Sequence, residues 1–227
     1  MEVSSGGRKK VYSVAIDGPA GAGKSTVAKM VAKRLNLTYV DTGAMYRAIT
    51  LKVLERGEFS REEIIKSAEE STIEIKNGRI YLDGRDVTEE IRKPCIDEKV
   101  SIVASIPQVR KKLVEIQRKM AQSCGVVMDG RDIGTTVLPD AKYKFYLTAD
   151  LKIRAKRRYE EMLNKGLRVD LEKVEEELAQ RDKKDMEREC SPLKVADDAV
   201  IIDTSYKTPE EVVKEILDYI KRDENVL

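Results

Sequence analysis

The strongest constraint on the fold of this chain is a glycine-rich segment near its beginning. Residues 18–25 read GPAGAGKS and fit the pattern GxxxxGK[ST], in which backbone N–H groups and the positive end of a helix surround a phosphate group. The apolar, β-branched stretch Val11–Ile16 precedes this segment and predicts a buried strand. An apolar stripe from about Ser25 to Leu35 predicts a helix after it. This order predicts a phosphate-binding loop, with a tight turn and a solvated lysine as the alternative.

Two side chains at the end of this loop have the chemistry that a nucleoside triphosphate requires. Lys24 can reach the β- and γ-phosphates, and the Ser25 hydroxyl can hold Mg²⁺. A regulatory GTPase would carry Asn-Lys-x-Asp, but the nearest string, residues 164–167, lacks the acid. A motor ATPase would favour an acidic pair after an apolar strand, whereas Asp129 is followed by Gly130. Together these observations favour a small phosphotransferase.

Composition excludes several other classes of function. The 227 residues include no histidine, so imidazole-based nucleophilic catalysis and histidine-ligated zinc are excluded. The 43 basic and 41 acidic residues leave a net charge of +2, which gives no bulk electrostatic case for nucleic-acid or membrane binding. No apolar run reaches the 18 residues of a membrane span. Three cysteines without a CxxC pair favour a reducing cytoplasm.

Alternation of strands and helices predicts an α/β fold with a five-stranded, mostly parallel sheet flanked by helices. After the first strand, the expected strands are Leu37–Val40, Val126–Met128, Tyr143–Leu147 and Ala199–Ile202. The further helices expected around this sheet are Met45–Glu55, one beginning at Pro107, Leu151–Lys165, Leu171–Glu187 and one from a Thr208 cap to about Lys221.

A different pattern interrupts this alternation between the second helix and Pro107. Residues 60–63 form a capping box that begins a short helix. Short strands at 72–75, 79–82 and after Arg85 are separated by Asn-Gly and Asp-Gly dipeptides, which favour hairpin turns. We therefore expect a small antiparallel insert within the α/β fold.

Two arginine-containing strings follow predicted strands and indicate where a second substrate binds. Residues 41–47 read DTGAMYR and residues 129–134 read DGRDIG. Ligands of open parallel sheets bind beyond the carboxyl ends of the strands, and a guanidinium matches two phosphate oxygens. Arg47 and Arg131 are therefore candidates to bind a second phosphate. The alternative is a surface pair of either arginine with Asp41 or Asp132.

Helical spacing places Arg181, Asp185 and Arg188 on one face of a predicted helix. An active-site role and an intrahelical salt-bridge ladder both fit this spacing. The basic run from Lys152 to Arg158 is a candidate RNA patch, but acidic neighbours and the lack of interleaved aromatic residues argue against that interpretation.

Four ordered motifs together resemble the bacterial cytidylate kinases, which are P-loop nucleoside monophosphate kinases. They are IDGPAGAGKST at 16–26, DTGAMYR at 41–47, DGRDIGT at 129–135, and the set Arg181, Asp182, Asp185 and Arg188. The resemblance extends from about Val11 to Ile220. It implies transfer of the γ-phosphoryl group of ATP to CMP or dCMP with Mg²⁺. Composition and charge add the expectation of a cytoplasmic protein that binds neither nucleic acid nor membrane, and we expect a monomer.

The resemblance also implies a role for each matching residue. The residues expected at the ATP phosphates are Gly18, Pro19, Ala20, Gly21, Ala22, Gly23, Lys24, Ser25 and Thr26, with Ser25 also at the metal. Those expected at the acceptor phosphate are Thr42, Arg47 and Arg131. Those expected at cytosine are Ser101, Arg110, Asp132 and Arg188, while Asp185, oriented by Arg181, is expected at the ribose. Those expected to act in catalysis are Lys24, Arg131, Arg157 and Arg158.

Domain organisation follows from the same resemblance. We expect a flexible tail at 1–10, a kinase core formed by 11–58 and 122–227, and an inserted monophosphate-binding region with the β meander at 59–121. Residues 152–170, which contain Arg154, Arg157 and Arg158, are expected to form a mobile lid with a hinge around Lys165 and Gly166. Ala20 and Thr42 stand where relatives often have serine, which puts a side-chain contact at residue 20 in doubt.

Other functions remain open at this point. One is a small P-loop kinase that phosphorylates UMP or a phosphate-free metabolite, and another is a nucleotide-gated binding protein without catalysis. An RNA-binding protein is the third, and its retention on RNA would depend steeply on salt.

Overall fold

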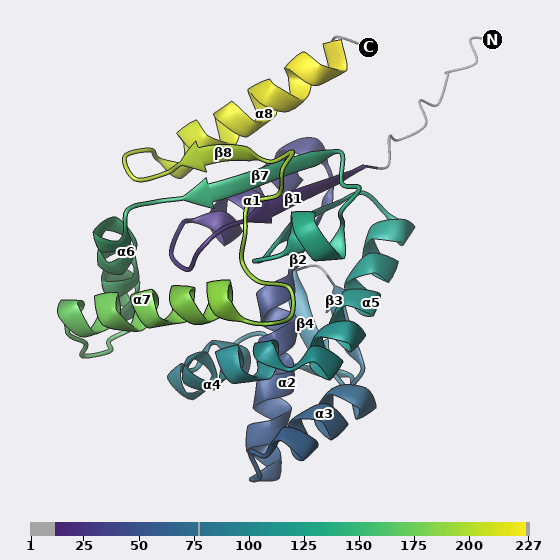
Figure 1. The fold of residues 1–227 in the computed structure, drawn as a ribbon, viewed down its shortest axis with the longest axis vertical. Helices are drawn as coiled ribbons and strands as arrows, with labels where there is room; N and C mark the ends of the chain where they lie inside the picture. Colours follow the sequence, from purple (N-terminus) through teal and green to yellow (C-terminus); the bar gives the residue numbers. More distant parts are fainter. Residues whose placement is uncertain (1–11, 77, 226–227) are drawn as a thin grey trace.

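Five parallel strands in the order β2-β6-β1-β7-β8 form the central sheet of the computed structural model (Figure 1). The structure describes residues 12–76 and 78–225. The expected tail, Val11 of the first predicted strand and Asn77 of the first predicted turn lie outside the described residues. The strands are β1 (Ser13–Asp17), β2 (Thr38–Asp41), β6 (Val126–Asp129), β7 (Tyr143–Thr148) and β8 (Val200–Asp203). Because β1 lies between β6 and β7, the glycine loop after it reaches the middle of the sheet's carboxyl edge.

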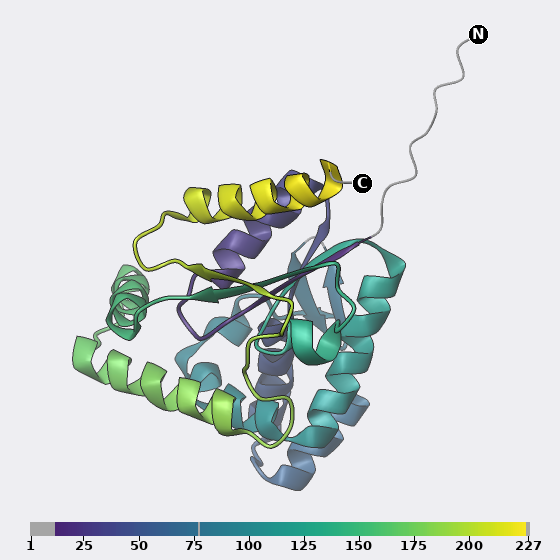
Figure 2. The ribbon, with the colours of Figure 1, turned by 45° about the horizontal axis from the view of Figure 1, so that its top comes forward.

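Helices cover both faces of this sheet. Helices α1 (Lys24–Leu35) and α8 (Pro209–Asn225) lie on one face, and α5 (Pro107–Ser123) lies on the other (Figure 2). Val27 and Val31 of α1 pack with Val213 and Ile216 of α8 in one buried cluster. Since parallel strands bury both faces, these layers explain the continuous apolar runs of the strand sequences.

A second buried cluster lies beside the sheet and joins helices to a small antiparallel sheet. The helices are α2 (Thr42–Arg56), α3 (Arg61–Glu70) and α4 (Pro94–Ser105), together with part of α5. The strands are β3 (Ile73–Lys76), β4 (Arg79–Leu82) and β5 (Arg85–Asp86). Asp83 and Gly84 both have positive φ, 51° and 82°, as the two central residues of a type I′ hairpin turn require. The predicted antiparallel insert is therefore confirmed.

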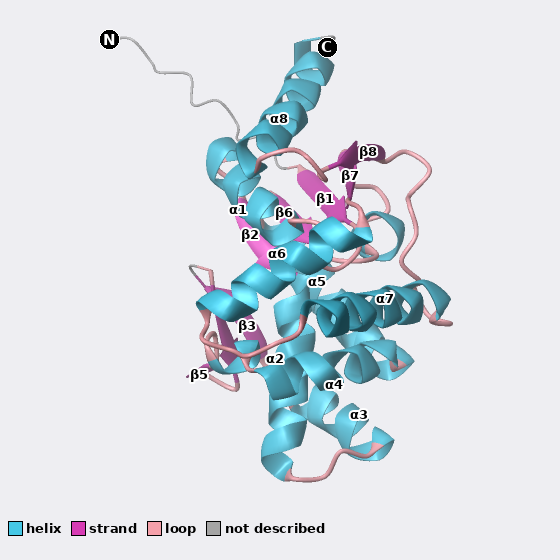
Figure 3. Cartoon of the chain, turned by 90° about the vertical axis from the view of Figure 1, so that its left-hand side faces the viewer, coloured by secondary structure: helices cyan, strands magenta, loops and turns pink. Residues whose placement is uncertain are grey.

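Two further helices, α6 (Leu151–Asn164) and α7 (Leu171–Glu187), pack against each other beyond the carboxyl ends of the strands. Figure 3 shows α6 in front of the sheet and α7 beside α4. These two helices and α4 therefore enclose the space that the glycine loop faces.

The predicted fold class is confirmed, and most predicted elements agree with the structure within a few residues. Three elements were not predicted: helix α4, a 3₁₀ turn at Glu90–Arg92 and a π-helical turn at Ile133–Val137. The second helix begins at Thr42 rather than Met45, because the Asp41 carboxylate caps it by accepting from the Ala44 N–H.

Two observations bear on the environment of the protein. Cys95, Cys124 and Cys190 are free thiols. Among residues 12–76 and 78–225, the helices lack the combination of length and apolar composition that crossing a bilayer requires.

Candidate active site

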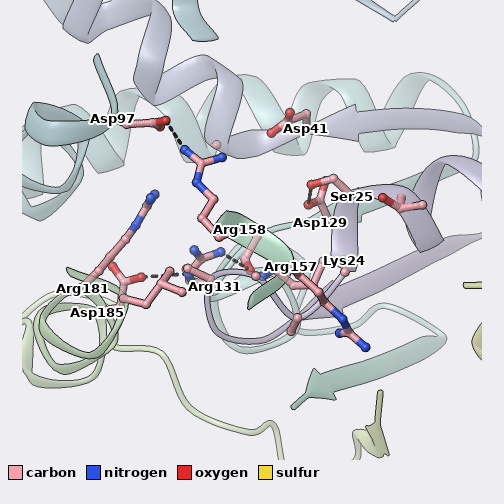
Figure 4. Close-up of a pocket in the computed structure, with 18 of the residues that line it drawn as sticks. Lys24, Ser25, Asp41, Asp97, Asp129, Arg131, Arg157, Arg158, Arg181 and Asp185 are labelled. Atoms are coloured by element: carbon pink, nitrogen blue, oxygen red, sulfur yellow. Dashed lines mark hydrogen bonds and ion pairs between the residues drawn. The ribbon is translucent and has the colours of Figure 1, made fainter. Parts of the chain in front are cut away.

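A cleft of about 840 Å³ opens at the carboxyl edge of the central sheet (Figure 4). Its walls come from the glycine loop and α1, from the starts of α2 and of the turn after β6, and from α4, α6 and α7. Of the predicted site residues, Gly18 and Pro19 do not line it, whereas all those expected at the acceptor do. The residues expected at the acceptor, all of which line the cleft, are Thr42, Arg47, Ser101, Arg110, Arg131, Asp132, Arg181, Asp185 and Arg188.

Backbone geometry explains the glycines of the loop. Gly18 has a φ of 143°, and a Cβ there would lie 2.0 Å from the carbonyl oxygen of Leu147 on β7. Gly23 caps α1 in the left-handed region with a φ of 83°. A side chain at Gly18 would therefore push the loop from the sheet, and one at Gly23 would strain the helix start that faces the cleft.

Lys24 is buried at the base of the cleft, and its ammonium group donates to the carbonyl of Pro19 at 2.5 Å. Burial and then the positive charge of Arg131 lower the pKa of Lys24 well below its ordinary value. Burial, Arg131 and Arg47 likewise lower the pKa of Arg181 to about 10. Cations crowded in this way favour an anionic ligand with several charges.

Oxygen atoms of Ser25 and Asp129 at the N-terminus of α1 suit a hard divalent cation. The Ser25 hydroxyl donates to Asp129 Oδ2 at 2.7 Å, and the Tyr39 hydroxyl donates to Asp129 Oδ1 at 2.8 Å. Burial and the nearby negative charge of Asp41 raise the pKa of Asp129 to about 6. No group of three metal-ligating side chains occurs in the described part of the chain. A hydroxyl beside one carboxylate nevertheless fits Mg²⁺, which keeps several waters and takes its other ligands from phosphates.

Arg47 of α2 and Arg131 of the turn after β6 come from different elements, and neither makes the surface pair considered from the sequence. Arg47 pairs with Asp97 of α4 rather than with Asp41. Arg131 donates through Nε to Asp185 of α7 at 2.8 Å rather than pairing with Asp132. Both guanidinium groups therefore line the cleft.

The predicted intrahelical ladder on α7 does not form. Asp185 accepts a hydrogen bond from Arg131. Arg181 acts on Asp185 only as a nearby positive charge, so Arg181 does not orient Asp185 through a hydrogen bond as expected. Arg188 follows the end of α7 and reaches Asp132 at 3.3 Å. These side chains face the cleft because α7 packs over it.

A compact polar cluster of Arg110, Asp132 and Arg188 lines the same cleft as Lys24. The Asp132 carboxylate pairs with the buried Arg110 through Oδ2 at 2.5 Å and with Arg188 through Oδ1 at 3.3 Å. The Arg110 guanidinium also lies over the Tyr46 ring, 5.3 Å from its centroid. Arg110 Nε is buried, and within the described chain it has no hydrogen-bond partner.

Thr42 and Ser101, two smaller residues of the predicted site, also line the cleft. The Thr42 hydroxyl donates to the backbone carbonyl of Asp129 at 2.7 Å, so its proton is engaged at the end of β6. Ser101 is half-buried on α4, beside the polar cluster.

The basic run of α6 does not form a continuous surface. Arg154 is buried, and it pairs with Asp182 at 2.5 Å and donates to the Ala20 carbonyl at 2.9 Å. Arg157 donates to the Thr204 carbonyl at 2.5 Å, whereas Arg158 reaches across to Asp97 at 2.6 Å. Of the three arginines grouped from the sequence, Arg154 therefore anchors the glycine loop, while Arg157 and Arg158 line the cleft.

Sequence reasoning missed several residues that shape the site. Asp97 and Arg92 lie in or near α4, an element that was not predicted, and Arg92 pairs with Asp41 at 2.7 Å. The Ala20 side chain packs between α6 and α7 beside Ala155 and Leu178, which explains why a small residue suits that position.

The comparisons with known proteins agree with this geometry. The family model described as cytidylate kinase matches residues 14–222. This chain belongs to the cytidylate kinase family. A cytidylate kinase of Caldanaerobacter subterraneus subsp. tengcongensis is 56% identical over 211 residues, covering 92% of this chain and 94% of the relative. A cytidylate kinase of Clostridioides difficile is 51% identical over 209 residues, covering 91% and 97%.

Solved structures of more distant proteins share the fold of this cytidylate kinase family member. A gluconokinase from Sinorhizobium meliloti matches with a TM-score of 0.51 and 13% identity, covering 96% of this chain and 97% of the other. A shikimate kinase from Acinetobacter baumannii matches with a TM-score of 0.50 and 18% identity, covering 95% and 96%. At these identities the likeness establishes the fold alone.

Proposed function

We propose that this chain transfers the γ-phosphoryl group of ATP to the phosphate of CMP or dCMP, giving ADP and CDP or dCDP. Membership of the cytidylate kinase family supports this reaction. The observation that carries it is a single cleft lined both by the glycine loop and by the Arg110–Asp132–Arg188 cluster.

The glycine loop and the start of α1 would hold the ATP phosphates. Backbone N–H groups at the helix start and the Lys24 ammonium would compensate the negative charge of the triphosphate. Ser25 would hold Mg²⁺ with help from Asp129, whose carboxylate the Ser25 and Tyr39 hydroxyls orient. The ion, when bound, would neutralise charge on the transferring phosphoryl group.

The acceptor phosphate would lie between Arg47 and Arg131, near Thr42. Phosphoryl transfer requires little proton chemistry from the protein but demands alignment and positive charge at the reacting oxygens. Two guanidinium groups from different elements of the cleft would fix the acceptor in line with the ATP γ-phosphate. A chain without histidine can meet this demand fully.

Cytosine would be recognised by the cluster around Asp132. Arg110 and Arg188 can donate to the acceptors O2 and N3, and the Asp132 carboxylate can accept from the N4 amino group. Ser101 would complete this end of the site, and Asp185 would face the ribose. Uracil presents the opposite pattern at N3 and O4, so it would leave buried partners unpaired.

Helices α6 and α7 would act as the lid, with the turn at Lys165 and Gly166 as its hinge. Gly166 has a φ of 75°, which favours glycine at this turn. Arg157 and Arg158 both line the cleft and would supply positive charge there; Arg157 is held by Thr204, which donates to the Ala22 carbonyl of the glycine loop, and Arg158 by Asp97. Closure of such a lid would exclude water, which is the competing acceptor.

Location and assembly complete the proposal. The three free thiols suit a reducing cytoplasm, where nucleotide substrates occur. A monomer suffices for catalysis, because one chain supplies both the phosphate-binding loop and the acceptor arginines.

A coupled assay of ADP production tests this function. CMP, dCMP, UMP and AMP are supplied in parallel with ATP, and CMP or dCMP should stimulate ADP release most strongly. Lys24→Ala should lower turnover by about 10²–10³-fold, as loss of one preorganised contact to the transition state does. Lys33→Ala, an exposed lysine on the same helix, is the matched control. Consumption of ATP that no monophosphate accelerates would reject the proposal.

A further inference from the structure

Asp97 links two parts of the cleft that the proposed function assigns to different phosphates. It lies near the start of α4, where one carboxylate oxygen pairs with Arg47 of α2. The other oxygen accepts from Arg158 Nη2 of α6 at 2.6 Å (Figure 4). A single carboxylate thus occupies one guanidinium from the acceptor side and one from the lid side.

The surroundings keep Asp97 charged. Burial alone would raise its pKa, but the positive charges of Arg47, Arg158 and Arg181 outweigh burial and lower the pKa below the ordinary value. Figure 4 shows Arg181 pointing to the same side of the cleft as Asp97. Three guanidinium groups therefore surround one carboxylate, and the group as a whole keeps a net positive charge.

Other carboxylates near these arginines do not make the same link. Glu161 pairs with Arg158 at 3.3 Å, but its side chain is 62% exposed and belongs to the same helix. Asp185 pairs with Arg131. Within residues 12–76 and 78–225, Asp97 is the carboxylate that pairs with arginines of both α2 and α6.

We propose that Asp97 is an internal counter-ion that competes with substrate phosphates for Arg47 and Arg158 and so sets how strongly the cleft binds anions. This inference rests on the proposed function for the assignment of the two arginines to phosphates. Asp97 is a positioning residue, because it acts through these arginines and not on a reacting atom.

Electrostatics gives the direction of the effect. A phosphate that binds Arg47 through Nη1 must displace Asp97 from that nitrogen, and the carboxylate then remains as a like charge beside the phosphate. A nucleotide offers enough additional contacts to offset this cost, whereas a small anion does not. Asp97 therefore weakens binding of inorganic anions more than it weakens binding of substrates. As a result, Arg47 and Arg158 bind nucleotides in preference to small anions.

Substitution of Asp97 by asparagine distinguishes competition with phosphates from a purely structural role in orienting Arg47. Asp97→Asn keeps the shape and removes the charge, and titration calorimetry with inorganic sulfate as the probe measures anion binding without turnover. We expect the variant to bind sulfate about tenfold more tightly, since interactions of partly buried charges at this distance reach at least that size. Asp97→Glu should return the affinity toward that of the wild type. Glu161→Gln, which removes the exposed partner of Arg158, should change it less than about twofold.

Steady-state kinetics gives the second readout. Asp97→Asn should lower the KM for CMP several-fold while changing kcat less, because the phosphate no longer has to displace a carboxylate from the arginines. A weaker or unchanged affinity for sulfate, or a raised KM for CMP, would overturn the proposal and make Asp97 a support that merely orients Arg47. Failure of the proposed function would appear separately, as a wild-type protein that binds sulfate but phosphorylates no monophosphate.

Discussion

At the scale of single residues, Asp132 is the side chain that the proposed function assigns to discrimination between pyrimidine bases. Arg110 and Arg188 hold its carboxylate from two sides, so it presents acceptor oxygens only. An asparagine at this position can donate as well as accept, and can therefore also serve uracil O4. We predict that Asp132→Asn narrows the preference for CMP over UMP by about tenfold or more, which corresponds to the cost of one buried unpaired polar group.

Measurement of kcat/KM for CMP and for UMP with the same preparation tests this prediction. Asp140→Asn, an exposed residue in the loop before β7, provides a control of the same chemistry. The prediction is wrong if the ratio of the two kcat/KM values is the same in Asp132→Asn and in the wild type.

Much of the candidate site could be predicted from the sequence, because its residues cluster in short strings at strand ends. Arg47 and Arg131 line the cleft as the position of their strings after β2 and β6 indicated. The partners of these arginines could not be predicted, since Asp97 and Asp185 come from helices whose packing depends on the whole fold. The same reason applies to Arg154, which helical spacing alone does not distinguish from its neighbours.

At the scale of elements, the end of β1 fixes the turn that follows β6. The buried Asp17 carboxylate accepts from the backbone N–H of Ile133 at 2.8 Å and of Gly134 at 2.7 Å. Burial raises the pKa of Asp17 to about 6 in spite of these two bonds. Since Asp132 directly precedes the bonded N–H groups, Asp17 supports the orientation of the Arg110–Asp132–Arg188 cluster.

This tether predicts a dependence of stability on pH. Because the folded pKa lies above the unfolded value, the folded protein retains a proton that the unfolded chain releases, and stability falls as the pH rises from about 4 to 6. The total loss is about 3 kcal/mol, at 1.36 kcal/mol for each pKa unit. Asp17→Asn removes this titration, so the variant should not share this loss of stability. Between pH 4 and 7 the unfolding free energy of the variant should therefore rise relative to that of the wild type by up to about 3 kcal/mol.

Chemical denaturation at several pH values measures this difference. Asp17→Asn is expected to be less stable at pH 4, because an amide offers one acceptor oxygen where the carboxyl group has two. The informative quantity is therefore the change with pH and not the value at one pH. A pH-independent difference between the two proteins would show that Asp17 does not titrate in this range.

The elements themselves were predicted with uneven success, for physical reasons. The β-branched residues of β1, the aromatic residues of β7 and the Asp83-Gly84 turn are local signals, and each was found. Helix α4 was missed because its β-branched residues weaken the helical signal. Pro94 at the first turn and the spacing of Ile96, Val100 and Val103 are the signals that identify it in retrospect.

At the scale of the whole molecule, the antiparallel insert and the parallel sheet share helices instead of meeting at a separable interface. Helix α2 follows β2 without a linker, and its Met45 and Ile49 belong to the same buried cluster as Ile80 of β4. Helix α5 contributes Leu113 to this cluster and the adjacent Val114 to the cluster beneath the sheet. Truncation of a side chain in the insert should therefore destabilise the entire protein.

We predict that Ile80→Ala lowers the unfolding free energy by about 2–5 kcal/mol, the range for loss of a buried aliphatic side chain. Ile201→Ala removes the same atoms from edge strand β8, where the side chain is 59% exposed, and should cost less than about 1 kcal/mol. Far-UV circular dichroism and tyrosine fluorescence, recorded through the same denaturant series, should report one transition with one midpoint for both variants. An earlier, separate transition in Ile80→Ala would mean that the insert unfolds independently of the parallel sheet. This result would contradict the prediction that the shared helices couple the two parts.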